Sequence, residues 1–136
     1  MGDLRGDVNS LIEIFRLCGF PPETKYLFLG NLVGHGPQSL EVLWTLFAYR
    51  ITYPEHIFLL RGMNECLRVA RLNGFASECK TRHNMKALKA VINTFNCMPL
   101  AALIDDRVFA VSGGLSPDLE SLGQIDKVKR PIDVGI

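Results

Sequence analysis

The sequence of 136 residues has no long apolar run and no excess of charge of either sign. No stretch approaches the ~20 consecutive apolar residues that cross a membrane, and the polar opening, MGDLRGD, does not resemble the apolar core of a signal peptide. The 15 Lys and Arg oppose 14 Asp and Glu, which leaves no electrostatic footprint for nucleic acid or a lipid surface. These absences predict a cytoplasmic or nuclear protein that binds neither nucleic acid nor membrane.

Cysteine is scarce, and its spacing indicates neither a metal site nor a redox motif. The four cysteines, none of them in a CxxC pair, are Cys18, Cys66, Cys79 and Cys97. In a reducing compartment we expect free thiols in or near the core, and no zinc site. Apolar residues make up 48% of the chain and charged residues 21%. This balance is enough to bury a core, so residues 1–136 are predicted to form one domain.

The chain alternates short apolar strands with amphipathic helices. Apolar residues at helical spacing follow Asp7, a helix-capping residue, and Gly19 ends that first pattern. The predicted helices cover about 8–18, 38–49, 65–95 and 118–129, and the predicted strands cover 26–29, 57–60, 100–104 and 108–112, the last two as a hairpin. Fully apolar strands between helices favour an α/β fold with a parallel or mixed sheet. In such folds, binding sites form at the carboxyl ends of the strands.

Glycine-containing loops follow the predicted strands, and a similar loop opens the chain. They read GDLRG (2–6), GNLVGHG (30–36), GMNE (62–65) and SGG (112–114). GNLVGHG is not a Walker loop, because it lacks the GK[ST] ending. In order and spacing the four loops resemble GDxHG, GDxVDRG, GNHE and HGG, the motifs of the phosphoprotein Ser/Thr phosphatase family, which has the metallophosphoesterase fold. Framework segments such as GFPPETKYLFLG, FNCMPLAALID and GGLSPDLES are most similar to the type-1 branch of that family.

The resemblance implies a truncated domain. The family domain is about twice this length and has a β-sandwich at its centre. Residues 1–136 are therefore expected to form a partial phosphatase catalytic domain, a partial β-sandwich with flanking helices that lacks the first and the later strands. Missing strands would leave unpaired sheet edges and an uncovered apolar face.

The family's chemistry uses two divalent metals, Mn, Fe or Zn, held by carboxylates and imidazoles. The resemblance places Asp3 at a retained ligand position. Arg5 stands where the family has a ligating His, and its permanent positive charge repels a metal. Asn31 replaces the bridging Asp, Met63 a ligating Asn and Ser112 a ligating His. Only one of these five ligand positions is kept, so no metal cofactor is expected.

The rest of the family's catalytic machinery is substituted as well. Asn64 occupies the position of the His that protonates the leaving group, which an amide cannot do; general acid catalysis is typically worth ~10²–10⁴-fold in rate. Gly34 replaces the Asp that orients that His, and His35 replaces a phosphate-binding Arg. The sequence therefore predicts an inactive homologue, a pseudophosphatase, whose role would be to bind phosphatase regulators or to compete for them.

Two other functions stay open at this point. One is a metal-dependent Ser/Thr phosphatase with weak or altered metal use, in which Asp3, Asn31, His35 and Asn64 would hold at least one metal. The other is a non-catalytic binder of phosphate or phosphopeptides that uses Arg5, His35 and the loop amides. The first would be stabilised by a divalent metal, whereas the second would bind phosphopeptide in a salt-sensitive manner.

Some of these side chains also have a purely structural interpretation. Arg5 can form a surface ion pair with Asp3 or Asp7. The amides of Asn31 and Asn64 can hold the loops in shape through hydrogen bonds. On this interpretation the loops keep the family's backbone geometry without its chemistry.

The resemblance also indicates where a partner would bind. The four residues that match positions near an acidic docking groove of the family are Glu55, Phe58, Asp105 and Asp106. Phosphatase regulatory proteins are the partners that this groove implies.

Overall fold

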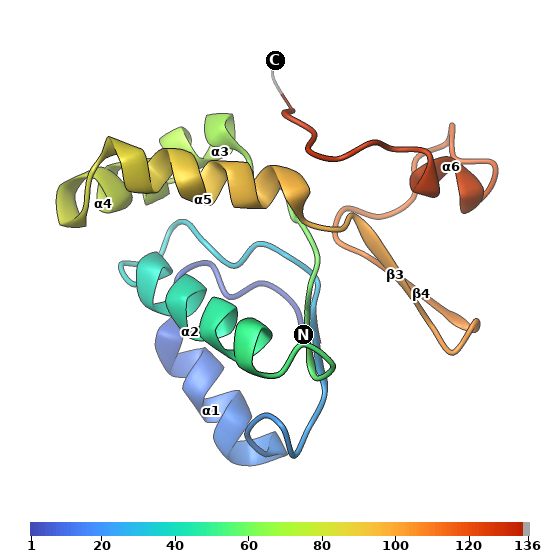
Figure 1. Ribbon diagram of the computed structural model, residues 1–136, viewed down its shortest axis with the longest axis horizontal. Helices are drawn as coiled ribbons and strands as arrows, with labels where there is room; N and C mark the ends of the chain where they lie inside the picture. Colours follow the sequence, from blue (N-terminus) through green and yellow to red (C-terminus); the bar gives the residue numbers. More distant parts are fainter. Residues whose placement is uncertain (135–136) are drawn as a thin grey trace.

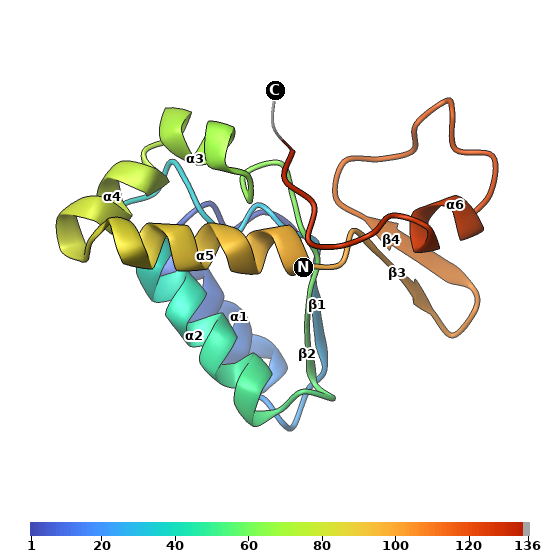
Figure 2. The same cartoon turned by 45° about the horizontal axis from the view of Figure 1, so that its top comes forward.

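The computed structural model describes residues 1–134, in which six helices and four strands are present. The helices are α1 Val8–Cys18, α2 Ser39–Thr52, α3 Leu67–Leu72, α4 Phe75–Arg82, α5 Met85–Cys97 and α6 Gly123–Asp126, and the strands are β1 Tyr26–Phe28, β2 Ile57–Leu59, β3 Ala101–Ile104 and β4 Val108–Val111. Helices α1 to α5 gather on one side of the molecule, and the β3–β4 hairpin and α6 extend to the other (Figure 1). Strands β1 and β2 lie between these two groups (Figure 2). None of the helices in the described range is long and apolar enough to cross a membrane.

Helix α1 forms where the sequence predicts it, because it has both a cap and an apolar face. The Asp7 carboxylate accepts hydrogen bonds from the N–H groups of Asn9 and Ser10 at 3.0 and 3.1 Å, which satisfies two of the free donors of the first turn. Leu11 and Phe15 point into the core and are fully buried. Gly19, with φ of 95°, ends the helix.

Strands β1 and β2 form the predicted parallel sheet, with Leu27 opposite Phe58. Met1 lies along the other edge of β1. Its ammonium group donates to the carbonyl of Leu27, and the N–H of Leu29 donates to the carbonyl of Met1, both at 2.9 Å. The two strands run side by side and end at the loops that carry the candidate site (Figure 2).

The stretch predicted as largely helical, residues 65–95, is broken into α3, α4 and α5. Gly74 separates α3 from α4 in a left-handed conformation with φ of 91°, which glycine adopts without strain. The side chain of Asn84 then accepts a hydrogen bond from the N–H of Ala87 at 2.9 Å and caps α5. Local capping residues thus decide the breaks, while the apolar face of α5, including Leu88 and Phe95, remains buried in the core.

A carboxylate of α4 caps α2 from the outside. Glu78 accepts hydrogen bonds from the N–H groups of Ser39 and Leu40 at 3.3 and 3.2 Å, where the positive end of the helix dipole favours a negative charge. Arg82 binds Glu41 through two hydrogen bonds of 2.6 and 2.8 Å, and Glu78 at 3.2 Å. These contacts fix the packing of α4 against the first turn of α2.

Strands β3 and β4 form the predicted antiparallel hairpin, with Ala101 opposite Val111. Three residues, 105–107, connect the strands. Asp105 and Asp106 have φ values of 52° and 51°, and the N–H of Arg107 donates to the carbonyl of Ile104 at 3.0 Å, so the two aspartates are the central residues of a tight turn. The described residues therefore hold two separate two-stranded sheets, one parallel and one antiparallel. This arrangement matches the expected mixed α/β fold with a partial sandwich.

The last predicted helix, 118–129, is wrong in its extent, because α6 contains only four residues. The side-chain oxygen of Gln124 accepts hydrogen bonds from the N–H groups of Glu120 and Ser121 at 2.8 and 3.2 Å. This local side-chain contact gives those backbone groups a partner without a helical turn.

The prediction for the cysteines is partly wrong. All four are free thiols, as expected, and Cys79 is buried, but Cys18 and Cys97 are exposed. Both exposed cysteines are the last residues of their helices, α1 and α5. Their side chains lie on the solvent side of the final turn, where the apolar periodicity that predicts burial no longer applies.

The cap of α1 leads to a pH-dependent prediction. The hydrogen bond from the Ser10 hydroxyl, followed by that from the Ser10 N–H, holds the pKa of Asp7 below its ordinary value of 3.8. A lowered folded-state pKa means that the stabilisation is present above the unfolded value and is lost as pH falls through the folded one. Asp7→Ala should therefore lower the urea midpoint at neutral pH, by an amount that stays constant down to about pH 5 and shrinks below it.

The matched control for this measurement is Asp118→Ala, an exposed aspartate whose side chain accepts no hydrogen bond in the described residues. Its urea midpoint should equal that of the parent at every pH. Equal midpoints of the parent and Asp7→Ala at neutral pH would show that the cap does not stabilise α1.

Candidate functional site

The loop at residues 2–6 is held against the loop at 30–36 by backbone hydrogen bonds. The carbonyl of Asn31 accepts from the N–H groups of Leu4 and Arg5 at 3.1 and 2.9 Å, and the carbonyl of Leu32 accepts from Gly6 at 2.9 Å. In return, the N–H of Gly36 donates to the carbonyl of Arg5 at 2.7 Å. Two of the four predicted site loops therefore lie in direct contact.

The carboxylate of Glu65 joins the loop at 62–65 to the loop at 30–36. One oxygen accepts hydrogen bonds from the N–H groups of Asn31 and Gly62, both at 2.8 Å, and the other accepts from Leu32 at 2.8 Å and Val33 at 3.4 Å. Glu65 is completely buried, and its burial raises the pKa of the carboxyl while the N–H donors act against that rise. The carboxylate thus holds the two loops together by accepting hydrogen bonds from backbone N–H groups that no strand or helix satisfies.

The same two loops approach each other so closely that only glycine fits. A Cβ placed on Gly62 would lie 2.6 Å from the amide oxygen of Asn31 and 2.9 Å from the carboxylate of Glu65. Gly30 has φ of 98°, and a Cβ there would overlap the backbone of Gly62. The retained glycines thus have a geometric function at this contact.

Polar side chains form a continuous chain across the three loops. Both Nε and a terminal nitrogen of Arg5 donate to one carboxylate oxygen of Asp3, at 3.0 and 2.7 Å. The other oxygen of Asp3 accepts from the amide of Asn31 at 3.1 Å, and the amide oxygen of Asn31 accepts from the N–H of Asn64 at 3.1 Å. The ion pair of Arg5 is therefore with Asp3 and not with Asp7, which caps α1.

The backbone of these loops is strained at three non-glycine positions. Arg5, Asn31 and His35 have φ values of 49°, 53° and 66°, in the left-handed region that side chains with a Cβ rarely occupy. Such residues persist only where the surroundings enforce them, and they are frequent at functional loops. The backbone strain of these loops costs free energy, which the hydrogen bonds to Glu65 help to offset.

The remaining predicted site residues do not converge on one pocket. Asn64 is buried and donates to the carbonyl of Val33 at 2.8 Å, so its amide stabilises the loop. Met63 is 69% exposed. Ser112 follows β4, and no hydrogen bond in the described residues joins it to the other loops. His35 is exposed, and its own N–H donates to the carbonyl of Asn73 at 3.0 Å.

Gly34, which the sequence predicts to stand in place of an orienting Asp, has no room for a side chain. A Cβ at this position would overlap the side-chain amide of Asn73, and Gly34 has φ of 92°. The amide nitrogen of Asn73 is buried without a hydrogen-bond partner in the described residues. Asn73 thus fills the space into which an aspartate side chain at residue 34 would have to extend.

The residues at these loops do not fit a dinuclear metal centre. Within residues 1–134, no three side chains of His, Cys, Asp or Glu come together as a metal-binding group. Asp3 is the one carboxylate among the predicted ligand positions, and both of its oxygens are hydrogen-bonded to Arg5 and Asn31. A guanidinium group beside the carboxylate adds positive charge where two dications would have to bind.

A buried arginine, Arg61, holds the loop at 62–65 against the rest of the domain. Arg61 is 6% exposed, and its guanidinium donates to the carbonyl of Glu65 at 2.9 Å, to the side chain of Asn96 at 2.9 Å and to the carbonyl of Ile132 at 2.7 Å. Figure 1 shows the C-terminal segment passing over the end of α5, close to this junction. Arg61 therefore connects the loop to α5 and to the C-terminal segment.

The parallel strands, with the candidate loops at their carboxyl ends, belong to a phosphoesterase fold. The family model for calcineurin-like phosphoesterases matches residues 1–136, and the chain belongs to this metallophosphoesterase family, within its Ser/Thr phosphatases. A solved protein serine/threonine phosphatase from Saccharomyces cerevisiae, described as similar to human phosphatase PP5, matches with a TM-score of 0.93 at 30% identity over 97% of this chain. These matches confirm the predicted family and fold class. The chain spans 42% of the length of that phosphatase.

The sequence interpretation missed Glu65 and Arg61. A signal for Glu65 was available, because a loop with glycines at residues 30, 34 and 36 leaves backbone N–H groups that need an acceptor. Glu65 is the one carboxylate in GMNE, directly after the second strand. Three of its four donors are separated from it by more than 30 residues, so no local pattern identifies them.

Removing the carboxylate of Glu65 should destabilise the whole domain. Glu65→Gln replaces one acceptor oxygen by an NH2 group that faces backbone donors, and each unsatisfied buried group costs about 1–3 kcal/mol. We expect a loss of unfolding free energy on the order of 3 kcal/mol, measured by urea denaturation. The exposed Glu55→Gln should change it by less than about 0.5 kcal/mol. Equal losses in the two variants would mean that the Glu65 hydrogen bonds are not what stabilises the loops.

Proposed function

We propose that this chain is a catalytically inactive member of the Ser/Thr phosphatases that acts as a binding module, competing for phosphatase regulatory proteins. The observation that carries the proposal is the ion pair between Arg5 and Asp3. The one retained ligand carboxylate is bound by a guanidinium group at 2.7 Å, so the position that would attract a metal is already neutralised. The hydrogen bond from Asn31 to the same carboxylate supports this interpretation.

The loss of the metal centre and the loss of the acid are separate obstacles to catalysis. Metals in such sites generate the nucleophile and polarise the phosphoryl group. The general acid is typically worth ~10²–10⁴-fold, and Asn64 is buried with its amide committed to the carbonyl of Val33. These losses overlap and are not additive, but either one would nearly abolish turnover.

The proposed partner site is the surface near Phe58 and the tip of the β3–β4 hairpin. Phe58 is 40% exposed, and the guanidinium of Arg50 lies 5.6 Å from the centre of its ring. Phe58 and Asp105 line one groove of about 430 Å³ together with β1 and β3 residues. Glu55 and Asp106 are exposed nearby in the sequence. The lining of the groove is mostly apolar, and its charged residues are Asp105 and Lys25. This lining supports docking of a hydrophobic segment of a regulator.

The two alternative functions have less support. A weak metal-dependent phosphatase would need donors that the loops do not bring together. A phosphate binder would need a free guanidinium, but that of Arg5 is occupied by Asp3 in the same loop. Restoring the orienting aspartate at Gly34 would also require Asn73 to move.

The proposal predicts neither turnover nor metal binding. With Mn²⁺ added, hydrolysis of a phosphoserine peptide should equal that of the buffer blank, and metal analysis should find no stoichiometric Mn, Fe or Zn. A site filled at 100 times its dissociation constant would add about 2.7 kcal/mol of stability, so an unchanged Tm in Mn²⁺ is the third expected result.

Asp3→Ala is the matched variant for this experiment. Any trace hydrolysis that persists in this variant comes from a contaminant. The opposite result, stoichiometric metal together with turnover that disappears in Asp3→Ala, would establish an active metallophosphatase.

A further inference from the structure

The near-zero net charge of the chain conceals a strong local asymmetry. Residues 67–97, which form α3, α4 and α5, hold six of the 15 Lys and Arg but only one of the 14 Asp and Glu. Their formal charge is +5, whereas the rest of the chain carries −4. The one acidic residue, Glu78, is engaged with Arg82 and with the N-terminus of α2. Positive charge is therefore concentrated in this segment, which the total charge of the chain does not indicate.

The positive residues surround a groove. Helices α3 and α4 lie along one side of α5 (Figure 2), and a groove of about 560 Å³ runs between them. Its cationic residues are Arg71, Lys80, Lys86 and Lys89. None of these four lies within 4.0 Å of an Asp or Glu carboxylate among the described residues. Four positive groups thus remain available to a ligand.

The floor of the groove is apolar. It is lined by Leu67, Met85, Leu88 and Ile92. Met85, the first residue of α5, is 59% exposed. A flexible methionine at a helix edge adapts to varied apolar partners. An apolar floor with a cationic rim matches an amphipathic helix that presents leucine-like residues on one side and acidic residues at its flanks.

The chain already places one carboxylate at this groove. Asp133 is among the lining residues, and its neighbour Ile132 is fixed by hydrogen bonds to the carbonyl of Asn96 at 2.9 Å and from Arg61 at 2.7 Å. An acidic side chain delivered by an extended segment is therefore compatible with the shape of the groove.

Nucleic acid is the other polyanion that a basic groove attracts, but the lining disfavours it. Single-stranded nucleic acids are bound by stacking of bases on aromatic side chains. The groove residues include no Phe, Tyr, Trp or His. The groove combines positive charge with aliphatic surface, which a protein segment matches better than bases do.

We infer that the groove between α3, α4 and α5 binds an acidic amphipathic helix of a partner protein. The binding needs the rim of Arg71, Lys80, Lys86 and Lys89 and the aliphatic floor. It does not involve the loops of the candidate site, so it is independent of whether the chain hydrolyses phosphate esters.

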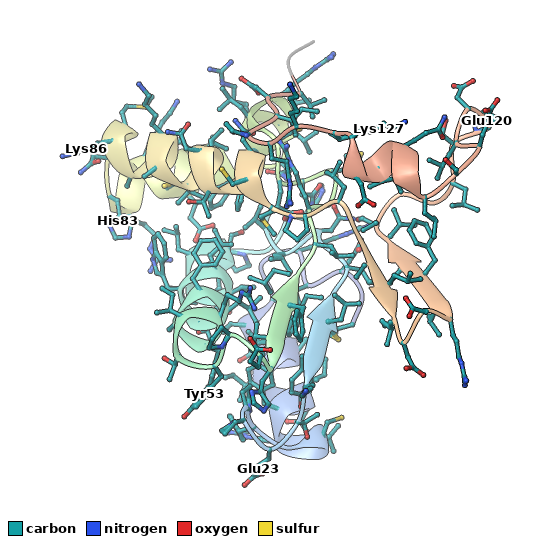
Figure 3. All side chains as sticks on the ribbon, turned by 45° about the vertical axis from the view of Figure 1, so that its right-hand side comes forward. Glu23, Tyr53, His83, Lys86, Glu120 and Lys127 are labelled. Atoms are coloured by element: carbon teal, nitrogen blue, oxygen red, sulfur yellow. The ribbon has the colours of Figure 1, made fainter. Side chains whose placement is uncertain are left out.

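The experiment uses a designed, fluorescein-labelled helix of about 16 residues with leucines at i, i+3, i+4 and i+7 and glutamates on both flanks. Fluorescence anisotropy is recorded with the whole chain at about 0.02 M and about 0.3 M salt. We expect binding that weakens with salt, and a loss of at least ~10-fold in affinity in the double variant Lys86→Glu/Lys89→Glu. Figure 3 shows Lys86 at the free end of α5, directed away from the rest of the chain.

The double variant Lys127→Glu/Lys129→Glu is the matched control. It makes the same change of charge near α6, at the opposite side of the chain in Figure 3, and should bind the peptide within about twofold of the parent. A peptide of the same composition in scrambled order should bind more weakly, because it has no apolar face. Arg71→Gln gives a second variant, and circular dichroism confirms that each protein is folded.

Three results would overturn the inference. The first is no binding of the designed helix by the parent at low salt. The second is an equal loss of affinity in the two double variants, which would mean attraction to net charge alone. The third is a tighter binding of polyuridylate that displaces the peptide, which would assign the groove to nucleic acid.

Discussion

The buried carboxylate of Glu65 is the constraint on which the loop region depends. Its two oxygens accept four backbone hydrogen bonds. Three come from residues 31–33, more than 30 residues away in the sequence, and one comes from Gly62 in its own loop. Without this acceptor, the loop at residues 30–36 could not turn sharply in the interior, because its N–H groups have no strand or helix to satisfy them. The close approach at Gly30 and Gly62 and the left-handed backbone of Asn31 follow from the same contact.

The structure separates the support of a phosphatase site from its chemistry. The supporting parts are backbone hydrogen bonds, close-packed glycines and the buried Glu65, and they remain in place. The side chains at the predicted catalytic positions make contacts within the loops: Arg5 with Asp3, Asp3 with Asn31, and Asn64 with the backbone carbonyl of Val33. Most of the contacts that hold the loops are made by backbone groups, so the shape of the loops depends little on which side chains the loops carry.

The fold could be predicted where the causes are local. The Asp7 cap, the apolar face of α1 and the turn at Asp105 and Asp106 can each be recognised within a few residues, and all three are as expected. The predicted extent of the last helix was wrong because the side-chain oxygen of Gln124 accepts hydrogen bonds from the N–H groups of Glu120 and Ser121, which competes with a longer helix. The candidate site was predicted as a set of loops, but the partner of each polar residue depends on contacts across the chain.

The sequence by itself determined the family and the order of strands and helices, and it predicts which ligand and acid positions are substituted, because these are properties of residue identity and spacing. Only the tertiary structure decided that Arg5 pairs with Asp3, that Asn73 fills the space beside Gly34, and that Glu65 and Arg61 hold the loops. It also gathered four of the six Lys and Arg residues of segment 67–97 around one groove. Hydrogen bonds and charge clusters between distant segments depend on how the chain folds back on itself, and no local pattern of residues predicts which distant segments meet.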